Sequence, residues 1–299
     1  MRFGQKPIDQ PKTMNYKKVA SARQVFIDHR TAAPDELAAL EKSFFKSLCL
    51  PNGTHKTTAP ARLREVDEVT ATLIKGRKAI SLLDVAISTG VTTLELLEHL
   101  ERQGISTSGV GVDICVRANL HSVPGLDVLY DAEGSALQVA TPLFARGRPD
   151  KSQSSVQSKV LRLTMDLLEL PLVRTCMQNL SRRRQLDLVS PRLTARSQFE
   201  IVEHDICRPQ PKWEANFDVV RAANILNSDY FAPQQISVMV SNLASWLKVG
   251  GILIVCSTSA EDDSNHGSFY RKQNAAGKLE LVYCLGRGFE RDHQIRSVA

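Results

Sequence analysis

A chain of 299 residues with 42% hydrophobic and 23% charged side chains has the composition of a globular protein, and it contains no apolar run long enough to span a bilayer. Its net charge of +6 comes from residues 141–196, which carry eleven Lys and Arg against four acids, so it lacks the evenly basic surface of nucleic-acid-binding proteins. The six cysteines show no metal-ligand spacing, which argues against a metal site and, without a secretory signal, indicates a reduced cytoplasmic protein.

The first 78 residues divide into a tail and a set of helices. Residues 1–18 are poor in apolar side chains, so we expect a disordered tail before a domain that occupies 19–299. Leading helices are predicted within 19–78, because apolar residues recur at helical spacing between Ser21 and Leu50 and again between Ala61 and Lys75.

A strand, a tight turn and a helix follow one another next. The apolar run Ile80–Val85 is too short for a helix and predicts a buried parallel strand. Small residues follow, and helical spacing then resumes until Gly104. This order is typical of the first half of a nucleotide-binding unit, in which the ligand lies against the turn and the free N–H groups of the helix N-terminus.

A second short strand, 108–114, ends in Asp113, which lies 23 residues after Gly90. An acid at this position commonly binds the ribose hydroxyls in nucleoside-binding folds. The spacing therefore indicates a nucleoside ligand without choosing which one.

The region 126–197 interrupts this pattern, and we expect it to be an insert. It opens with a hairpin whose strands are predicted at 126–130 and 137–140. Two amphipathic helices hinged at Pro171 are predicted next, followed by the basic run Arg182–Arg184. Three interpretations fit this segment: a helical hairpin packed on the core, a cap over a substrate site, or, through 156–184, a peripheral contact with an anionic membrane.

The pattern of core elements resumes after the insert. Three strands and one helix are predicted, at 198–206, 217–226 and 247–258 for the strands and 233–247 for the helix. Arg221 and Asn224 lie toward the carboxyl end of the second of these strands, where ligands bind in open α/β sheets. Two final strands, 279–284 and 293–298, are predicted to form an antiparallel pair.

The stretch LDVAISTG resembles the first motif of the class I, Rossmann-like, S-adenosylmethionine (SAM)-dependent methyltransferases, in which an acid leads into a glycine-rich turn. Asp84 is the acid, Ala86 and Ser88 replace two of the glycines, and Gly90 is the third, so the motif is degenerate. The turn at Gly250-Gly251, which feeds a strand, is similar to a later part of the same family pattern, and 217–226 with its flanking residues resembles the chemoreceptor-type protein carboxyl methyltransferases.

The resemblance implies an α/β fold with a doubly wound seven-stranded sheet, mostly parallel with an antiparallel C-terminal hairpin, helices on both faces and a helical insert. It implies SAM as the cofactor, bound across the carboxyl ends of the strands. The implied cofactor-binding residues are Asp84, Ala86, Ser88, Gly90, Asp113, Ile114, Asp205, Ile206, Arg221 and Asn224. Arg62 and Arg64 are candidates for the carboxylate of the cofactor.

The chemistry that the resemblance implies is methyl transfer to an acceptor that the sequence does not identify. Acidic small molecules, protein carboxylates and lipids all suit the basic insert. No universal catalytic residue is required, and the candidates for deprotonating an acceptor are His266, Asn224 and Tyr230.

Two alternatives to this function remain open at the level of sequence. A degenerate methyltransferase-like protein that acts by interaction alone is one, because Ala86 and Ser88 alter the turn. An NAD-dependent oxidoreductase is the other, since it would share Asp113, although it predicts neither the Gly250-Gly251 turn nor the terminal hairpin. The sequence sets no oligomeric state.

Overall fold

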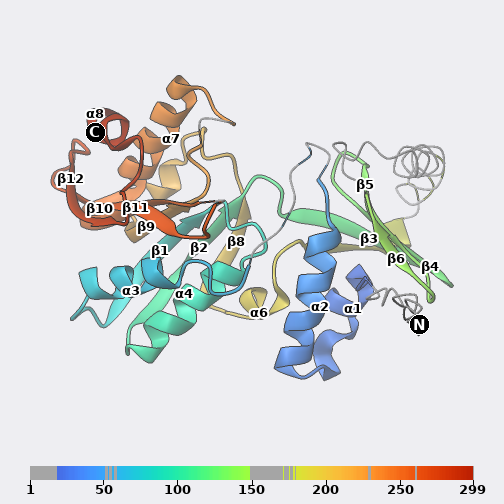
Figure 1. The fold of residues 1–299 in the computed structure, drawn as a ribbon. Helices are drawn as coiled ribbons and strands as arrows, with labels where there is room; N and C mark the ends of the chain where they lie inside the picture. The colour runs from blue at the N-terminus through green and yellow to red at the C-terminus, as the bar shows by residue number, and fades with distance from the viewer. Residues whose placement is uncertain are drawn as a thin grey trace, which may run out of the picture.

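The computed structural model describes residues 19–50, 53, 56, 59–148, 171, 175, 178, 180–227, 230–259 and 261–298. The predicted tail and nearly all of the helical part of the insert lie outside these described residues. Within them the chain forms two sheets, and Figure 1 shows the larger one with helices on both of its faces and the smaller one to its side.

The larger sheet has seven strands in the order β12-β11-β10-β9-β1-β2-β8. Its strands are β1 (Ala79–Val85), β2 (Ser106–Asp113), β8 (Phe199–Glu203), β9 (Phe217–Ala223), β10 (Leu247–Thr258), β11 (Asn265–Lys272) and β12 (Leu279–Leu285). The first five pair in parallel, and β11 runs antiparallel to both of its neighbours. The predicted fold class, a mostly parallel seven-stranded sheet with an antiparallel C-terminal hairpin, is confirmed.

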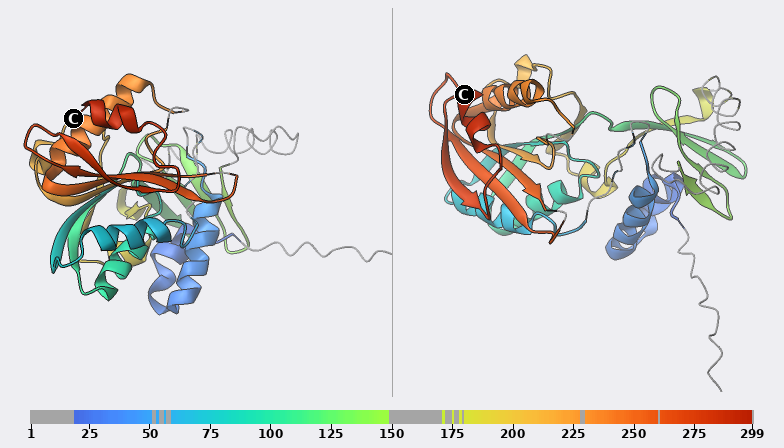
Figure 2. Two further views of the ribbon diagram at one scale, coloured as in Figure 1. Left: turned by 60° about the vertical axis from the view of Figure 1, so that its left-hand side comes forward. Right: turned by 45° about the horizontal axis from the view of Figure 1, so that its top comes forward.

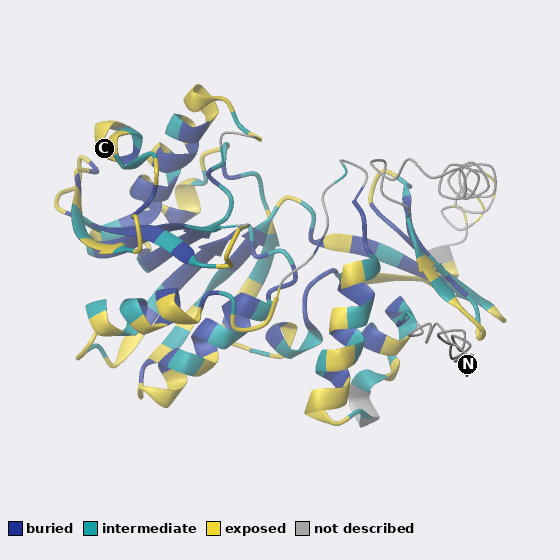
Figure 3. Ribbon diagram, viewed as in Figure 1, coloured by how far each residue is buried: buried dark blue, intermediate teal, exposed yellow. Residues whose placement is uncertain are grey.

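Helices cover both faces of this sheet because its central strands are apolar on both sides. On one face lie α3 (Arg64–Leu73), α4 (Val91–Arg102) and α6 (Pro191–Thr194); on the other lie α7 (Pro233–Trp246) and α8 (Asp292–Val298). Successive residues of β1 supply the two cores: Leu82 packs toward α4, and Leu83 packs toward α7. Figure 3 shows the same division, with buried residues lining the helix sides that face the strands.

The terminal hairpin uses other residues than the sequence predicted. Its strands are β11 and β12, whereas His293–Val298, predicted as a strand, belongs to helix α8. Ile295 is completely buried in the α7 side of the core, and Asp292 pairs with Arg296 one turn later, as an amphipathic helix requires. The polar stretch that leads into β11 concealed that strand.

The smaller sheet is antiparallel, with the strand order β6-β5-β4-β3-β7. Its strands are β3 (Arg117–Val123), β4 (Leu126–Tyr130), β5 (Ala136–Ala140), β6 (Ala145–Gly147) and β7 (Arg183–Asp187). The predicted hairpin is thus present as β4 and β5, but it is one part of a sheet that the sequence pattern did not reveal. Arg182 ends the 3-10 turn η2 (Leu180–Arg182), and the other two arginines of the basic run open the edge strand β7.

The first two helices pack on the smaller sheet rather than on the larger one. They are α1 (Ala22–Phe26) and α2 (Pro34–Ser47), separated by the 3-10 turn η1 (Asp28–Thr31). Phe44 and Phe45 of α2 share a buried cluster with Leu120 of β3 and Leu129 of β4. The two further views in Figure 2 show the same grouping, with α1 and α2 beside the antiparallel sheet.

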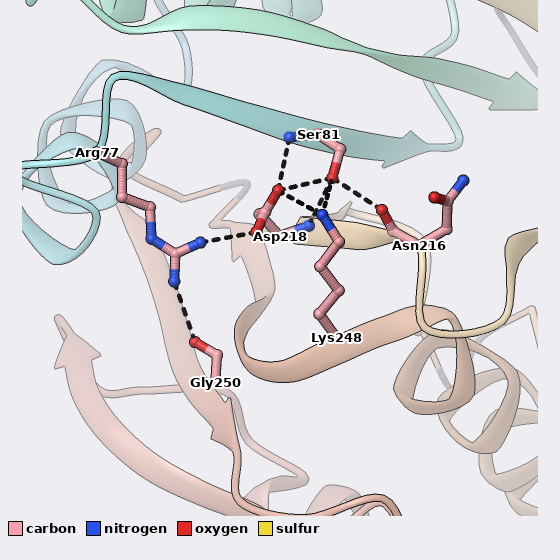
Figure 4. Close-up of polar contacts among 6 residues, drawn as sticks. All are labelled: Arg77, Ser81, Asn216, Asp218, Lys248 and Gly250. Carbon is pink, nitrogen blue, oxygen red and sulfur yellow. Dashed lines mark hydrogen bonds and ion pairs between the residues drawn. The ribbon is translucent and has the colours of Figure 1, made fainter.

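A polar network ties together the amino ends of the central strands (Figure 4). Asp218 of β9 accepts hydrogen bonds from the backbone N–H of Ser81 at 2.9 Å, from its Oγ at 2.7 Å and from Nζ of Lys248 at 2.9 Å. Its other oxygen accepts from Arg77 at 2.8 Å, and Arg77 also reaches the carbonyl of Gly250. This network fixes the irregular start of β10, where its register with β9 shifts between Leu247 and Ile252. The 3-10 turn η3 (Pro211–Trp213) lies just before β9.

Replacing Asp218 by Asn should lower the free energy of unfolding by about 1–3 kcal/mol at pH 7, because charge-assisted hydrogen bonds are lost. Burial works to raise the pKa of Asp218, but hydrogen bonds from Ser81 and the ion pair with Lys248 outweigh burial and lower it. A lowered carboxyl pKa stabilises the fold above the unfolded-state pKa, near 4, and that stability is lost as the pH falls through the folded-state pKa. Urea titrations of the wild-type protein and of Asp218→Asn between pH 7 and pH 2 measure the pH dependence of this difference in unfolding free energy.

The two unfolding free energies should converge at acid pH. Glu214→Gln removes an exposed charge close to β9 in sequence and serves as the control, with no expected change. A deficit in Asp218→Asn that stays constant down to pH 2 would contradict the role assigned to the ionised carboxylate.

Candidate functional site

The turn after β1 has the backbone conformation of a glycine-rich loop without two of its glycines. Ala86 has φ of 57° and Ser88 has φ of 54°, both left-handed, and Gly90 has φ of 72°. A side chain in this region costs roughly 1–2 kcal/mol. The loop is held nonetheless, because Ile87 is buried and its N–H donates to the carbonyl of Val112 at 3.1 Å. The replacements therefore change the side chains and leave the path of the turn intact.

Gly90 is required for a second reason, which is the lack of space above it. A Cβ atom at this position would lie 2.6 Å from side-chain carbons of Val189 and Leu193. The N–H of Ser190 in the same segment donates to the carbonyl of Thr89 at 2.8 Å. The segment that enters α6 therefore covers the end of the turn.

Asp113 lies at the end of β2, as predicted, and the structure places its carboxylate directly against the turn. One carboxylate oxygen accepts from the N–H of Ser88 at 2.8 Å and the other from the N–H of Cys115 at 3.1 Å. A carboxylate oxygen has two lone pairs, so each can accept one further hydrogen bond. Ile114, the next residue, is 62% exposed and offers an apolar surface beside the carboxylate.

Asp84 and Arg221 are joined in a buried ion pair beneath the turn. Arg221 is 1% exposed; its Nε donates to Asp84 at 3.0 Å, and its Nη1 donates to Asp67 of α3 at 2.9 Å. Asp84 also accepts from the hydroxyl of Thr93 in α4 at 2.7 Å. Both side chains were predicted as cofactor contacts, and the structure engages them in holding β1, β9, α3 and α4 together.

Replacing each of the two acids that face Arg221 by asparagine should lower the free energy of unfolding by unequal amounts. Burial raises the pKa of Asp67 to about 7, against an opposing effect of Arg221. A raised carboxyl pKa means that the folded state binds the proton more tightly, so this group loses stability as the pH rises from about 4 to 7. We expect Asp84→Asn to cost about 3–5 kcal/mol at pH 5 and pH 8, as for a broken buried ion pair. Asp67→Asn should cost less at pH 8 than at pH 5, by about 1–3 kcal/mol.

Denaturant unfolding of both variants at the two pH values is the measurement, with Glu65→Gln on the exposed side of α3 as the control. Equal costs of Asp67→Asn at both pH values would show that Asp67 does not titrate in this range.

Arg62 is the one of the two candidate arginines that turns inward. Its Nε is buried and has no hydrogen-bond partner within the described part of the chain, whereas Arg64 is exposed and paired with Glu68 at 3.1 Å. Burial lowers the pKa of Arg62, and the nearby Arg221 adds to that effect. Because its own backbone carbonyl accepts from the Asn265 side chain at 2.7 Å, the start of α3 is fixed to β11.

Asn224 follows β9 and joins the carboxyl ends of the strands on that side. It has φ of 59°, and its side-chain oxygen accepts from the N–H of Thr258 at 2.7 Å. The hydroxyl of Thr258 in turn donates to Asn265 at 3.0 Å. Asn224 is thus linked to Arg62 through two side chains.

The remaining predicted residues are not brought to the turn by any described contact. The ring of His266 lies between Ser264 and Arg287, and its Nδ1 accepts from the N–H of Arg287 at 3.2 Å. Tyr230 is 70% exposed. Asp205 follows β8 and accepts from the N–H of Cys207 at 2.9 Å, while Ile206 is buried in the core beside α7. His266, Asp205 and Ile206 thus have local structural partners, and their roles toward a ligand stay predictions.

Two residues at the site were missed from the sequence. Lys56 is 2% exposed and its Nζ donates to the carbonyl of Ser88 at 3.0 Å. Asp67 shares Arg221 with Asp84. Lys56 stands in a polar turn and Asp67 in an amphipathic helix, so neither carries a sequence signal of burial. Among the described residues no cluster of three or more His, Cys, Asp or Glu could hold a metal, and no helix has the length and apolarity to cross a bilayer.

No protein-family model matches the sequence, and no curated protein matches it. Solved structures with similarity include the 1,6-didemethyltoxoflavin-N1-methyltransferase of Burkholderia thailandensis with 1,6-didemethyltoxoflavin and S-adenosylhomocysteine (16% identity, 91% of this chain and 82% of that one, TM-score 0.39). A second is the N-methyltransferase NodS of Bradyrhizobium japonicum WM9 with S-adenosylhomocysteine (12% identity, 75% of this chain and 76% of that one, TM-score 0.36). A third is the citrinin polyketide synthase CMeT domain (12% identity, 67% of this chain and 35% of that one, TM-score 0.32). The match to the citrinin synthase thus spans about a third of that chain.

Proposed function

We propose that this chain is a SAM-dependent methyltransferase. The observation that carries the proposal is the buried Nε of the Arg62 guanidinium, which has no partner in the described part of the chain. A buried N–H donor without a partner is costly unless an acceptor joins it, and an anion is the acceptor that a guanidinium binds most strongly. The N-terminal side of α3 holds Arg62 next to α4, where Glu95 accepts from the N–H of Ala61 at 2.8 Å. The carboxylate of SAM is an anion that Arg62 would hold there.

The state of the loop amides favours SAM over NAD. The N–H groups of Ile87, Ser88 and Gly90 all donate within the protein, at 3.1, 2.8 and 2.8 Å. A dinucleotide places its diphosphate on free N–H groups of such a turn. Since these three are already satisfied, the turn suits a ligand whose anionic group lies elsewhere, as in SAM.

Asp113 supports the same ligand through the ribose. Its oxygens each accept one backbone N–H and keep a second lone pair for the two ribose hydroxyls. Ile114 would lie against the adenine as an apolar surface. Asp113 and Arg62 would thus hold two separate parts of one molecule.

Methyl transfer requires mainly that the protein position the acceptor beside the methyl group and exclude water from the site. Bound SAM supplies an activated methyl group, and in-line displacement needs the acceptor within about 3–3.5 Å. The chain contributes a rigid turn, fixed from below by the Arg221 ion pairs and covered by Val189 and Leu193. Since His266 is engaged with Ser264 and Arg287, the arrangement favours acceptors that need no base, such as a carboxylate or thiol.

Calorimetry on the purified protein should show binding of SAM and S-adenosylhomocysteine and none of NAD. Arg62→Gln should weaken SAM binding at least tenfold, and Asp113→Ala ten- to hundredfold, as charge-assisted hydrogen bonds worth about 1.5–3 kcal/mol are lost. Ala86→Gly should tighten binding, because it removes a Cβ from a left-handed position next to the cofactor.

Arg64→Gln is the matched control for Arg62→Gln, because Arg64 is exposed and paired on the surface of α3. It should leave SAM affinity unchanged. Binding of NAD, or no nucleoside binding by the folded protein, would reject the proposal. The latter result would favour a protein that acts by interaction alone.

We also infer that the basic run Arg182–Arg184 draws an anionic acceptor to the protein. The three side chains are exposed, and no hydrogen bond or ion pair engages them among the described residues. Their attraction acts through a screened field and should fade above about 0.15 M salt. Replacing all three by Gln should leave the affinity for SAM unchanged, and co-sedimentation with phosphatidylserine or phosphatidylcholine vesicles separates a lipid from a water-soluble acceptor. Loss of SAM binding in the folded triple variant would contradict this inference.

A further inference from the structure

A cavity of about 630 Å³ opens at the end of the smaller sheet that is remote from the cofactor turn. The turn between β3 and β4 lines it, with the turn between β5 and β6 and the first residues of α1. Arg117 begins β3 close to Asp113, and Val123, which lines the cavity, ends it. Six steps along a strand cover about 20 Å. The cavity is therefore separate from the turn after β1, and a ligand bound in it would be independent of the proposed cofactor.

Two arginines reach this cavity, and they differ in their pairing. Arg23 of α1 holds Asp127 through two hydrogen bonds, at 2.9 and 3.1 Å, so this pair is neutral and fixed in position. Arg182 lines the same cavity but makes no hydrogen bond or ion pair within the described residues. The wall thus carries one uncompensated positive charge beside a rigid ion pair.

The cavity lining also includes apolar side chains, one of which is largely exposed. Phe144, in the turn between β5 and β6, is 53% exposed and lines the cavity with Leu126 and Val123. Leu143, its neighbour, is 84% exposed. A phenyl ring left in water beside a cavity of this size is a surface that an apolar group would cover favourably.

We propose that this cavity binds a small amphipathic anion, with its carboxylate or phosphate on Arg182 and its apolar chain on Phe144 and Leu126. The guanidinium presents several donors to either head group. The cavity volume lies within the range of small-molecule sites, about 300–1,000 Å³. Ser122, which also lines the cavity, adds a hydroxyl to its polar surface.

Isothermal titration of the full chain with octanoate, octyl phosphate and uncharged 1-octanol tests the proposal. We expect at least one of the two anions to bind more tightly than 1-octanol. Arg182→Gln should weaken that binding about tenfold, the value of one charge-assisted hydrogen bond. Phe144→Ser should instead reduce the advantage of octanoate over butyrate, because it removes the apolar wall and leaves the charge.

Arg183→Gln is the matched control. Arg183 is exposed and adjacent to Arg182, but it does not line the cavity. It should leave binding unchanged. Binding of octanoate alone identifies a carboxylate ligand, and binding of octyl phosphate alone identifies a phosphate. The proposal is overturned if neither anion binds, if 1-octanol binds equally well, or if Arg183→Gln weakens binding as much as Arg182→Gln in proteins shown by circular dichroism to be folded.

Discussion

The pairing of Arg221 with Asp84 and Asp67 is the interaction on which the arrangement around the turn depends. It joins β9, β1 and α3 in one buried group, and Thr93 adds α4 through its hydrogen bond to Asp84. A buried arginine with one carboxylate would be neutral, and the second carboxylate leaves an excess of negative charge. Burial raises the pKa of Asp67 to about 7 against the opposing effect of Arg221, and a proton on this acid would remove that excess. The ends of two strands and two helices are thereby fixed below the place where a ligand would lie.

A turn supported in this way can hold residues that such a turn would normally exclude. Ala86 and Ser88 adopt left-handed conformations, and together they cost roughly 2–4 kcal/mol relative to glycine. The hydrogen bonds that Ile87 and Ser88 of the turn donate to Val112 and Asp113 of β2 offset that cost only if β1 and β2 stay in register. Without these glycines, the backbone conformation of the turn therefore depends on its contacts with the surrounding structure more than on its own sequence. Side chains at these positions then project where backbone alone usually meets a ligand.

The sequence predicted elements that carry a repeating residue pattern, but it did not predict features that depend on the contacts of single side chains. Apolar runs predicted the parallel strands, and the second of these runs placed Asp113 at the end of its strand. The smaller sheet escaped notice because its edge strands, Ala145–Gly147 and Arg183–Asp187, are short, contain exposed arginines and lack the alternation that marks a half-buried strand. Arg221 was placed at the right end of its strand, but burial within the sheet depends on partners 137 and 154 residues away, which no local pattern encodes.

The two sheets are connected by a buried charge as well as by the chain. Glu41 of α2 is 1% exposed and accepts from Ser190 at 2.7 Å and from Arg192 at 2.8 Å. Ser190 donates its own N–H to Thr89 in the turn after β1. A displacement of α2, which packs on the smaller sheet, would therefore have to break this ion pair or carry the cover of the turn with it. Since breaking an ion pair that contains a buried carboxylate costs several kcal/mol, the second course is the easier one, and Glu41 adds a second link, beside the chain itself, between the smaller sheet and the turn after β1.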